Sequence, residues 1–314
     1  MRLVTKRLAG MTMLLALCAA LAVGCSTATT AKTTSSTAAE NQTPFSGTLI
    51  LGADEAVSKM GDDQVIFVDC TGEMGSVEGA ISVTWQDLST CSAEYGHEGD
   101  EGWGKIPEPA DLAQRLGKLG LDKNKQIILL SHTTTGWGED GRIAWTLRAA
   151  GYQDVKLVDG GIDALVAAGA KTSLMSGAEP TPCTVEIDAI DTTHVIGTEE
   201  LQKNFADYKI VDVRATEEYE GATYYGEQKG GHIPGAIHIG YLDLFKDDGT
   251  LKPNDEITAM FEGAGVSKGD KVVAYCTGGI RSAYVQMVLE MCGYETTMNY
   301  DQSFWRWCVV GDVE

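Results

Sequence analysis

The sequence has little positive charge. Across 314 residues it holds 24 lysines and arginines against 45 aspartates and glutamates, which gives a formal net charge of −21 at pH 7. Nucleic acid is bound mainly through clustered cations, so this balance argues against nucleic acid as a partner. The negative field should also repel a small anion at long range, but at ~0.15 M salt exposed charges are screened beyond about 8 Å. The groups at a site therefore decide whether an anion binds there.

Three other patterns are missing. His, Cys, Asp and Glu do not occur together at the spacing of a metal site, so we expect no metal and no other cofactor. No G-x-S-x-G element is available to hold a hydrolase nucleophile. The apolar run at residues 8–23 is shorter than the ~20 residues that an ordinary spanning helix needs.

The amino-terminal segment has the pattern of an export signal. Arg2, Lys6 and Arg7 precede the apolar run, which predicts a signal peptide over residues 1–24. The sequence Ala-Val-Gly-Cys25 that ends it resembles the lipobox of bacterial lipoproteins, without the commoner Leu three positions before the Cys. This resemblance implies that the protein is exported and that Cys25 receives lipid. The lipid would anchor the protein to the outer face of the bacterial cytoplasmic membrane, or to a membrane surface on the periplasmic side. Secretion with an unmodified Cys25 is the alternative.

The rest of the chain predicts a tether and two domains. Residues 25–46 are rich in Thr, Ser and Ala without a packing pattern, as in a flexible linker. The remaining length exceeds that of one ordinary core. Polar, Gly and Pro residues interrupt the pattern near 170–185, so we expect one domain over 47–170 and a second over 184–314.

The two halves repeat each other. A repeated unit of this length is a domain, and short β-rich runs that alternate with helical stretches such as 110–119 and 255–263 predict an α/β fold with a mainly parallel sheet in each half. The segments that match in order are 64–69 with 209–212, 76–81 with 232–237, 126–130 with 271–275, 142–152 with 281–294, and 156–162 with 296–301.

A cysteine stands at the end of one predicted strand. Cys276 follows the apolar run 271–275 and precedes a helical stretch at 283–291. In such a turn several backbone N–H groups can converge on one point and favour an anion, here the thiolate. We therefore predict Cys276 and Arg281 as catalytic residues. The predicted substrate-binding loop comprises Thr277, Gly278, Gly279, Ile280 and Ser282. The alternative is a buried core cysteine.

Three segments together resemble the tandem-domain rhodanese family of sulfurtransferases. They are the run 210–214 with Glu218 and Tyr219, the run 231–237, and the Cys276 loop. The resemblance implies two rhodanese domains, each with a mainly parallel sheet flanked by helices. It also implies transfer of a sulfane sulfur through a Cys276 persulfide, from thiosulfate, or less readily mercaptopyruvate, to cyanide or a thiol. Arg281 would hold the oxyanion, and Arg214 would orient the loop or border the pocket. Glu218 departs from the family's two-domain thiosulfate enzymes, which usually have arginine there.

The first half lacks the cysteine. Ser131 or His132 occupies its position, so the resemblance implies an inactive domain that packs against the second and borders its cleft. Neighbouring strand residues point to opposite faces, which argues against a Ser131–His132 hydrolase pair.

Several further expectations concern single residues. Arg281 could instead form an ion pair with an acid such as Asp212, which ends a strand, and His232 fits a structural role in a turn. Trp305 and Trp307 could cover the pocket or fill the core. Spacing alone does not assign disulfides; a Cys70–Cys91 bridge is our prediction, since an exported location permits one.

Two alternative functions stay open. Cell-cycle phosphatases share this fold and place Cys and Arg in one loop, but their loop is one residue longer than the four residues between Cys276 and Arg281. A non-catalytic lipoprotein that only binds a partner is the second alternative.

Overall fold

The computed structural model describes residues 44–174 and 177–314, which belong to one compact unit, Gln42–Glu314. The predicted signal peptide, Cys25 and most of the predicted tether lie outside the described residues. Among the described residues, no helix combines the length and apolar character needed to cross a bilayer.

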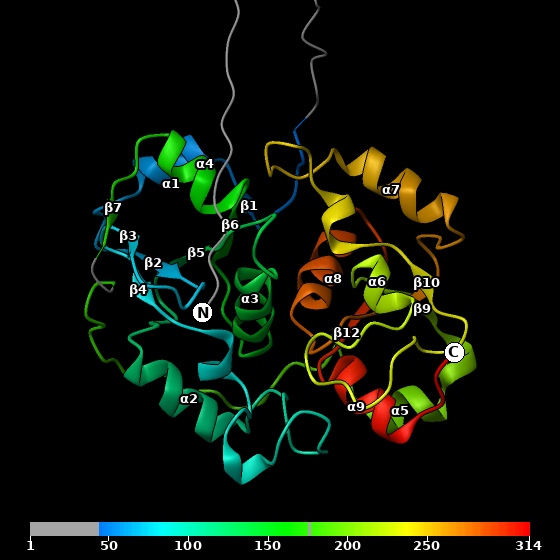
Figure 1. The fold of residues 1–314 in the computed structure, drawn as a ribbon. Helices are drawn as coiled ribbons and strands as arrows, with labels where there is room; N and C mark the ends of the chain where they lie inside the picture. Colours follow the sequence, from blue (N-terminus) through cyan, green and yellow to red (C-terminus); the bar gives the residue numbers. More distant parts are fainter. Residues whose placement is uncertain (1–43, 175–176) are drawn as a thin grey trace, which may run out of the picture. The chain divides into compact units, whose positions relative to one another are not determined.

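The amino-terminal half is a parallel sheet flanked by helices (Figure 1). Its strand order is β1-β6-β5-β2-β4, and every neighbouring pair is parallel. The strands are β1 (Ile50–Leu51), β2 (Val65–Asp69), β4 (Ile81–Ser82), β5 (Gln126–Leu130) and β6 (Val155–Val158). The helices are α1 (Ala53–Ser58), α2 (Pro109–Lys118), α3 (Glu139–Ala149) and α4 (Gly161–Ala167). The short strands β3 (Ser76–Val77) and β7 (Thr172–Ser173) form a separate antiparallel pair. Two 3₁₀ turns are η1 (Trp85–Leu88) and η2 (Ala93–Tyr95).

The carboxy-terminal half repeats this arrangement with the order β10-β9-β11-β12-β8, again parallel throughout. Its strands are β8 (Val195–Ile196), β9 (Lys209–Asp212), β10 (Ile237–His238), β11 (Lys271–Tyr275) and β12 (Thr296–Tyr300). The helices are α5 (Thr198–Lys203), α6 (Thr216–Tyr219), α7 (Asn254–Gly263), α8 (Arg281–Met291) and α9 (Ser303–Val310), with 3₁₀ turns η3 (Phe205–Asp207) and η4 (Tyr241–Leu244). The predicted α/β fold with two repeated, mainly parallel sheets is thus confirmed.

The central strands explain why each sheet is covered on both faces. In β5 and β11 the last four residues are buried in succession, so both faces of the strand lie against other parts of the protein. The matched runs at 76–81 and 232–237 contain less strand than the alignment suggested. Their glycines, Gly79 and Gly235, have positive φ and turn the chain. The first run therefore belongs to strands only at its two ends, and the second only at Ile237.

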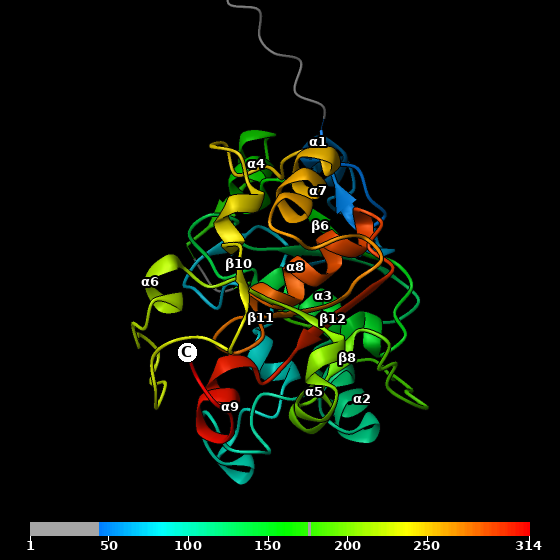
Figure 2. The ribbon, with the colours of Figure 1, turned by 90° about the vertical axis from the view of Figure 1, so that its right-hand side faces the viewer.

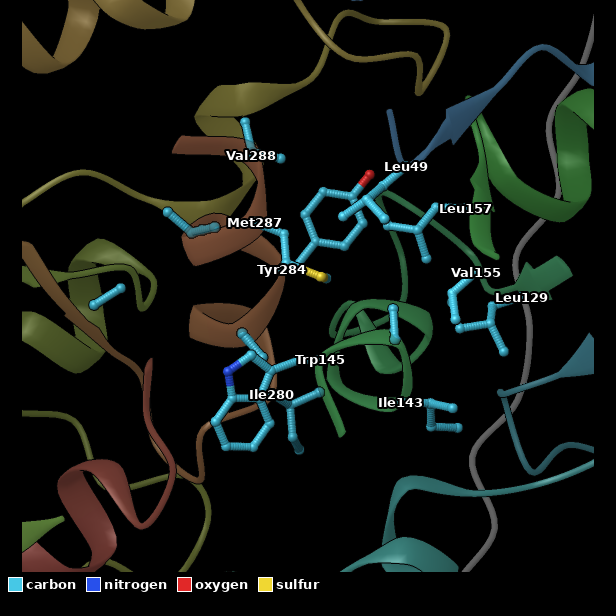
Figure 3. Close-up of a cluster of buried hydrophobic side chains, with 14 of the residues drawn as sticks. Leu49, Leu129, Ile143, Trp145, Val155, Leu157, Ile280, Tyr284, Met287 and Val288 are labelled. Carbon is cyan, nitrogen blue, oxygen red and sulfur yellow. The ribbon is translucent and has the colours of Figure 1, made fainter. Parts of the chain in front are cut away.

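The two halves pack through α3 and α8, which lie side by side in both views (Figures 1 and 2). One buried apolar cluster includes side chains of both halves, among them Ile143 and Trp145 of α3 and Tyr284 and Met287 of α8 (Figure 3). The helices approach closely at Gly141, where an added Cβ would lie 2.6 Å from Tyr284 Cβ and 2.8 Å from its Cα. An ion pair of 2.7 Å between Arg148 and Glu290 joins the same helices.

Replacement of Gly141 by alanine should destabilise the protein. Alanine improves helix propensity by about 1 kcal/mol, but overpacking a helix contact costs ~1–3 kcal/mol, and here the clash includes backbone that cannot rotate away. We expect Gly141→Ala to lower the free energy of unfolding in urea. Gly263→Ala in α7 is the matched control, because no atom lies within 4 Å of the added Cβ; it should be neutral or stabilising. Equal stability of the two variants would contradict this account of the helix contact.

Candidate active site

Cys276 begins the turn between β11 and α8, at the carboxyl edge of the second sheet. Its Sγ accepts a hydrogen bond from the Gly279 N–H at 3.1 Å, and the Ser282 Oγ lies 3.7 Å away. The residue is only 1% exposed, yet it borders a pocket that is shared with Thr277 and Gly278. Cys276 therefore belongs to the edge of the buried apolar cluster, as the core alternative expected, but it also borders a pocket and has a backbone donor directed at its sulfur.

The loop is held through its carbonyl groups. Two N–H groups at the start of α9 donate to these carbonyls. The Phe304 N–H donates to the Cys276 carbonyl at 3.0 Å, and the Trp305 N–H donates to the Thr277 carbonyl at 2.9 Å. The Cys276 N–H donates to Ser303 Oγ at 3.1 Å, and Ser303 adopts a positive φ of 49°. With these carbonyls bound to α9, the following N–H groups are free to turn toward the sulfur.

Gly279 is the position in the loop that only glycine suits. Its φ is +80°, and an added Cβ would lie 2.1 Å from the Asp301 carbonyl oxygen. Its N–H bonds Cys276 Sγ, so a side chain here would displace the donor that supports the thiolate.

Arg281 supplies the positive charge beside the sulfur. Burial raises the pKa of the Cys276 thiol, but the charge of Arg281 and hydrogen bonds from Ser282 and Gly278 lower it, and the net pKa lies below its usual value. The Arg281 side chain is 11% exposed and borders the pocket. A thiolate at this position is the form that attacks electrophilic sulfur.

Arg281 does form an ion pair with an acid, as the alternative interpretation expected, but the acid is Glu218 and not Asp212. Both guanidinium ends donate to Glu218, at 2.7 and 2.8 Å, and the Thr277 hydroxyl donates to the same carboxylate at 2.7 Å. Burial raises the pKa of Glu218, but these bonds and the Arg281 charge lower it below its usual value. Sequence analysis assigned no role to Glu218 beyond its departure from the family pattern, whereas in the structure it is the residue that holds Arg281 in place.

Arg214 does not border the pocket, contrary to prediction. Its side chain is fully buried, pairs with Asp212 at 2.6 Å, and lies over the Phe304 ring at 4.0 Å. Its Nε and Nη2 groups donate to Asp212 and to the Gly231 carbonyl, and Nη1 is buried without an acceptor, so the guanidinium lies in the core and not at the pocket. His232 stacks on Tyr219 at 3.8 Å, outside the residues that line the pocket.

The pocket has a volume of about 410 Å³, and several of its lining residues are aromatic. Both halves contribute to it. Of the two tryptophans in the last helix, Trp305 lines the pocket, whereas Trp307 is buried against Phe205. The lining residues are Trp85, Gln86, Cys91, Glu98, Trp103 and Trp137 from the first half, and Tyr225, Cys276, Thr277, Gly278, Ile280, Arg281 and Trp305 from the second.

The first half also holds the Cys276 loop directly. Arg142, the residue that aligns with Arg281, is fully buried and donates to the Gly279 carbonyl at 3.0 Å and to the Gly104 carbonyl at 2.7 Å. Its guanidinium lies over the Trp145 ring at 4.9 Å. The arginine of the first repeat thus acts on the loop of the second, a role that the sequence alignment could not indicate.

The residues in place of the cysteine in the first half do not form a pair. Ser131 Oγ donates to Glu139 at 2.9 Å, and His132 Nδ1 lies 3.5 Å from Asp163. Neither lines the pocket near Cys276.

The remaining cysteines of the described residues are free thiols, so the predicted Cys70–Cys91 bridge is absent. Cys70 lies in the core after β2, where burial raises its thiol pKa well above the usual value, while Cys91 lines the pocket. Cys70 lies in the core and Cys91 lies at the pocket, a difference that their spacing along the chain does not reveal. Within residues 44–174 and 177–314, no cluster of three or more His, Cys, Asp or Glu side chains could hold a metal ion.

Comparisons with known proteins agree with the fold. The chain is 26% identical over 259 residues to the sulfur carrier protein TtuD of Thermus thermophilus, which covers 78% of this chain and 85% of that protein. It is 25% identical over 229 residues to human 3-mercaptopyruvate sulfurtransferase (70% and 74%), and 24% identical over 247 residues to a thiosulfate sulfurtransferase of Corynebacterium glutamicum (75% and 77%).

Among solved structures, the Tum1 protein of Saccharomyces cerevisiae superposes with a TM-score of 0.69 at 17% identity, over 83% of this chain and 95% of that one. The wild-type structure of EanB gives 0.67 at 19% identity, over 82% of this chain; the match spans 64% of EanB. A family model described as a rhodanese-like domain matches residues 52–168 and 197–309. The chain therefore belongs to the rhodanese family and contains two rhodanese-like domains.

Proposed function

We propose that this protein is a sulfurtransferase that carries sulfane sulfur as a persulfide on Cys276. The observation that carries the proposal is the Cys276 Sγ itself, which accepts the Gly279 N–H at 3.1 Å, has a lowered pKa and borders a pocket. A preformed thiolate needs no separate general base. The sequence relatives named as sulfurtransferases support the same reaction class.

The reaction takes two displacements. The Cys276 thiolate attacks the outer sulfur of thiosulfate, a new S–S bond forms, and the bond within thiosulfate breaks with its electron pair leaving on sulfite. A thiolate or cyanide then attacks the outer sulfur of the persulfide, and Cys276 leaves again as thiolate. The Gly279 N–H is placed to stabilise negative charge on the sulfur in the free enzyme.

The choice of sulfur donor depends on how Arg281 is paired. Glu218 occupies both ends of the Arg281 guanidinium, so an oxyanion must share or displace this partner. We propose thiosulfate as the default donor and 3-mercaptopyruvate as the lesser choice, with cyanide or a thiol as acceptor.

Replacement of Cys276 by serine should abolish sulfur loading, because no other residue of the described pocket combines a lowered thiol pKa with a backbone donor. Wild-type protein incubated with thiosulfate should gain the mass of one sulfur atom, as read by intact-mass spectrometry. Cys276→Ser should gain none. Cys183→Ser, which alters a partly exposed thiol outside the pocket, is the control and should load normally. Persulfide on the Cys276→Ser protein would refute the assignment.

Removal of the Arg281 charge should raise the pKa of Cys276. The pKa now lies below its usual value partly because of this charge, and thiolate forms as pH rises through the pKa. The rate at which iodoacetamide alkylates Cys276 increases with pH as the thiolate forms. In Arg281→Met the midpoint of this increase should therefore lie at a higher pH than in the wild type. Lys209→Met removes the same charge from an exposed position at the start of β9 and should leave the profile in place. An unchanged profile in Arg281→Met would show that the backbone donors alone set the pKa.

We also propose that the protein is exported and anchored through lipid on Cys25. Support comes from the basic residues, the apolar run 8–23 and the lipobox-like Ala-Val-Gly-Cys25 sequence. When the full chain is expressed in a bacterium with radiolabelled palmitate, the wild type should carry label and sediment with membranes. Cys25→Ser should lose both properties. An unlabelled wild-type protein in the soluble exported fraction would favour simple secretion.

A further inference from the structure

The pocket in front of Cys276 is built from aromatic rings and holds little free positive charge. Five of its lining residues are aromatic, and Arg281 is the one cation among them. Glu218 neutralises Arg281 through two hydrogen bonds. The five rings, called here the aromatic cage, are Trp85, Trp103, Trp137, Tyr225 and Trp305.

Three residues of the cage, Trp137, Tyr225 and Trp305, contact one another or the Cys276 loop. Trp137 meets Tyr225 edge to face with ring centroids 5.3 Å apart, and Trp305 Nε1 donates to the Tyr225 carbonyl at 2.9 Å. The Trp305 ring lies against Gly278, where an added Cβ would be 2.2 Å from the ring. Contacts of this kind set the positions of aromatic faces before a ligand arrives.

One tryptophan of the cage is unusually open for its size. Trp137 is 44% exposed although it belongs to the pocket lining, and Trp103 Nε1 is buried without a hydrogen-bond acceptor among the described residues. The exposed face of Trp137 is available to a bound molecule, whereas the Trp103 N–H could only serve an acceptor atom of that molecule.

The charges of the pocket favour a cation. Arg281 and Glu218 cancel, whereas Glu98 in the lining and the sulfur anion on Cys276 both carry negative charge. Aromatic faces bind ammonium groups, quaternary ones above all, through cation–π interaction. The volume of about 410 Å³ suits a small molecule.

We propose that the aromatic cage selects a small cationic acceptor, a thiol that also carries an amine or quaternary ammonium group. This inference rests on the proposed sulfurtransferase function and specifies its acceptor. The ammonium group lies against the rings near Glu98, and the acceptor thiolate attacks the outer sulfur of the Cys276 persulfide. The S–S bond to Cys276 breaks, Cys276 leaves as thiolate, and the product is a cationic molecule with its own persulfide.

Three acceptors of similar size test the charge preference. Protein loaded with sulfur is mixed with thiocholine, with its neutral isostere 3,3-dimethylbutane-1-thiol, or with anionic 3-mercaptopropionate, and kcat/KM is compared per thiolate. We expect the kcat/KM of thiocholine to exceed that of the neutral thiol by about 30-fold, which corresponds to a desolvated cation–π contact of about 2 kcal/mol, and to exceed that of the anion by more. A neutral or anionic thiol that matches thiocholine would overturn the proposal.

Variants connect the preference to the cage. Trp137→Leu and Glu98→Gln should each lower the ratio of kcat/KM for thiocholine to kcat/KM for the neutral thiol, mainly by raising the KM for thiocholine. Trp137→Phe keeps an aromatic ring and should therefore retain part of this ratio. Glu94→Gln alters an acid of the neighbouring η2 turn outside the pocket and should keep the full ratio. A full ratio in both Trp137→Leu and Glu98→Gln would contradict the cage.

A binding measurement separates this proposal from the proposed reaction. Tetramethylammonium should bind the Cys276→Ser protein and quench tryptophan fluorescence, and Trp137→Leu should weaken the effect. If the cation binds but the wild type never gains sulfur, the sulfurtransferase proposal fails and the cage stands. If the wild type gains sulfur but the cation does not bind, the cage fails and the sulfurtransferase stands.

Discussion

The site depends on how the carbonyl groups of one short loop are held. The N–H groups at the start of α9 bind the carbonyls of Cys276 and Thr277, and Arg142 binds that of Gly279. These bonds orient the loop so that the Gly279 N–H meets the sulfur. Each buried acceptor would cost about 1–3 kcal/mol if left without a donor, so the loop conformation is enforced from both sides. The chemistry of Cys276 follows from this arrangement.

Duplication has given the two repeats different tasks at matching positions. Arg281 and Arg142 correspond in the alignment, but Arg281 faces the pocket beside Glu218, and Arg142 crosses to the loop of the other repeat. The close approach of α3 to α8 at Gly141 makes this possible, because it brings Arg142 within reach of Gly279. The first repeat has no cysteine at the position that matches Cys276, and its Arg142 supports the cysteine loop of the second repeat.

The sequence was sufficient for what is local or periodic. The central strands of each sheet, the longer helices, the repeat and the position of Cys276 at a strand end follow from patterns within a few residues or from the matched halves, whereas the two-residue edge strands β1 and β8 were not predicted. It was insufficient for pairings across the fold. Which acid meets Arg281, Glu218 or Asp212, depends on side-chain reach in three dimensions, and Arg214 was misplaced for the same reason. The tryptophans of the first half, such as Trp137, are far from Cys276 in the chain and enter the pocket only through domain packing.

Three of the five rings around the pocket, those of Trp85, Trp103 and Trp137, belong to the repeat without the nucleophile. Substitutions at these three positions would reshape the pocket wall while the cysteine loop keeps its own sequence. Part of the surface that faces a ligand is thus encoded far from the nucleophile, in the half of the gene that has no cysteine at the matching position.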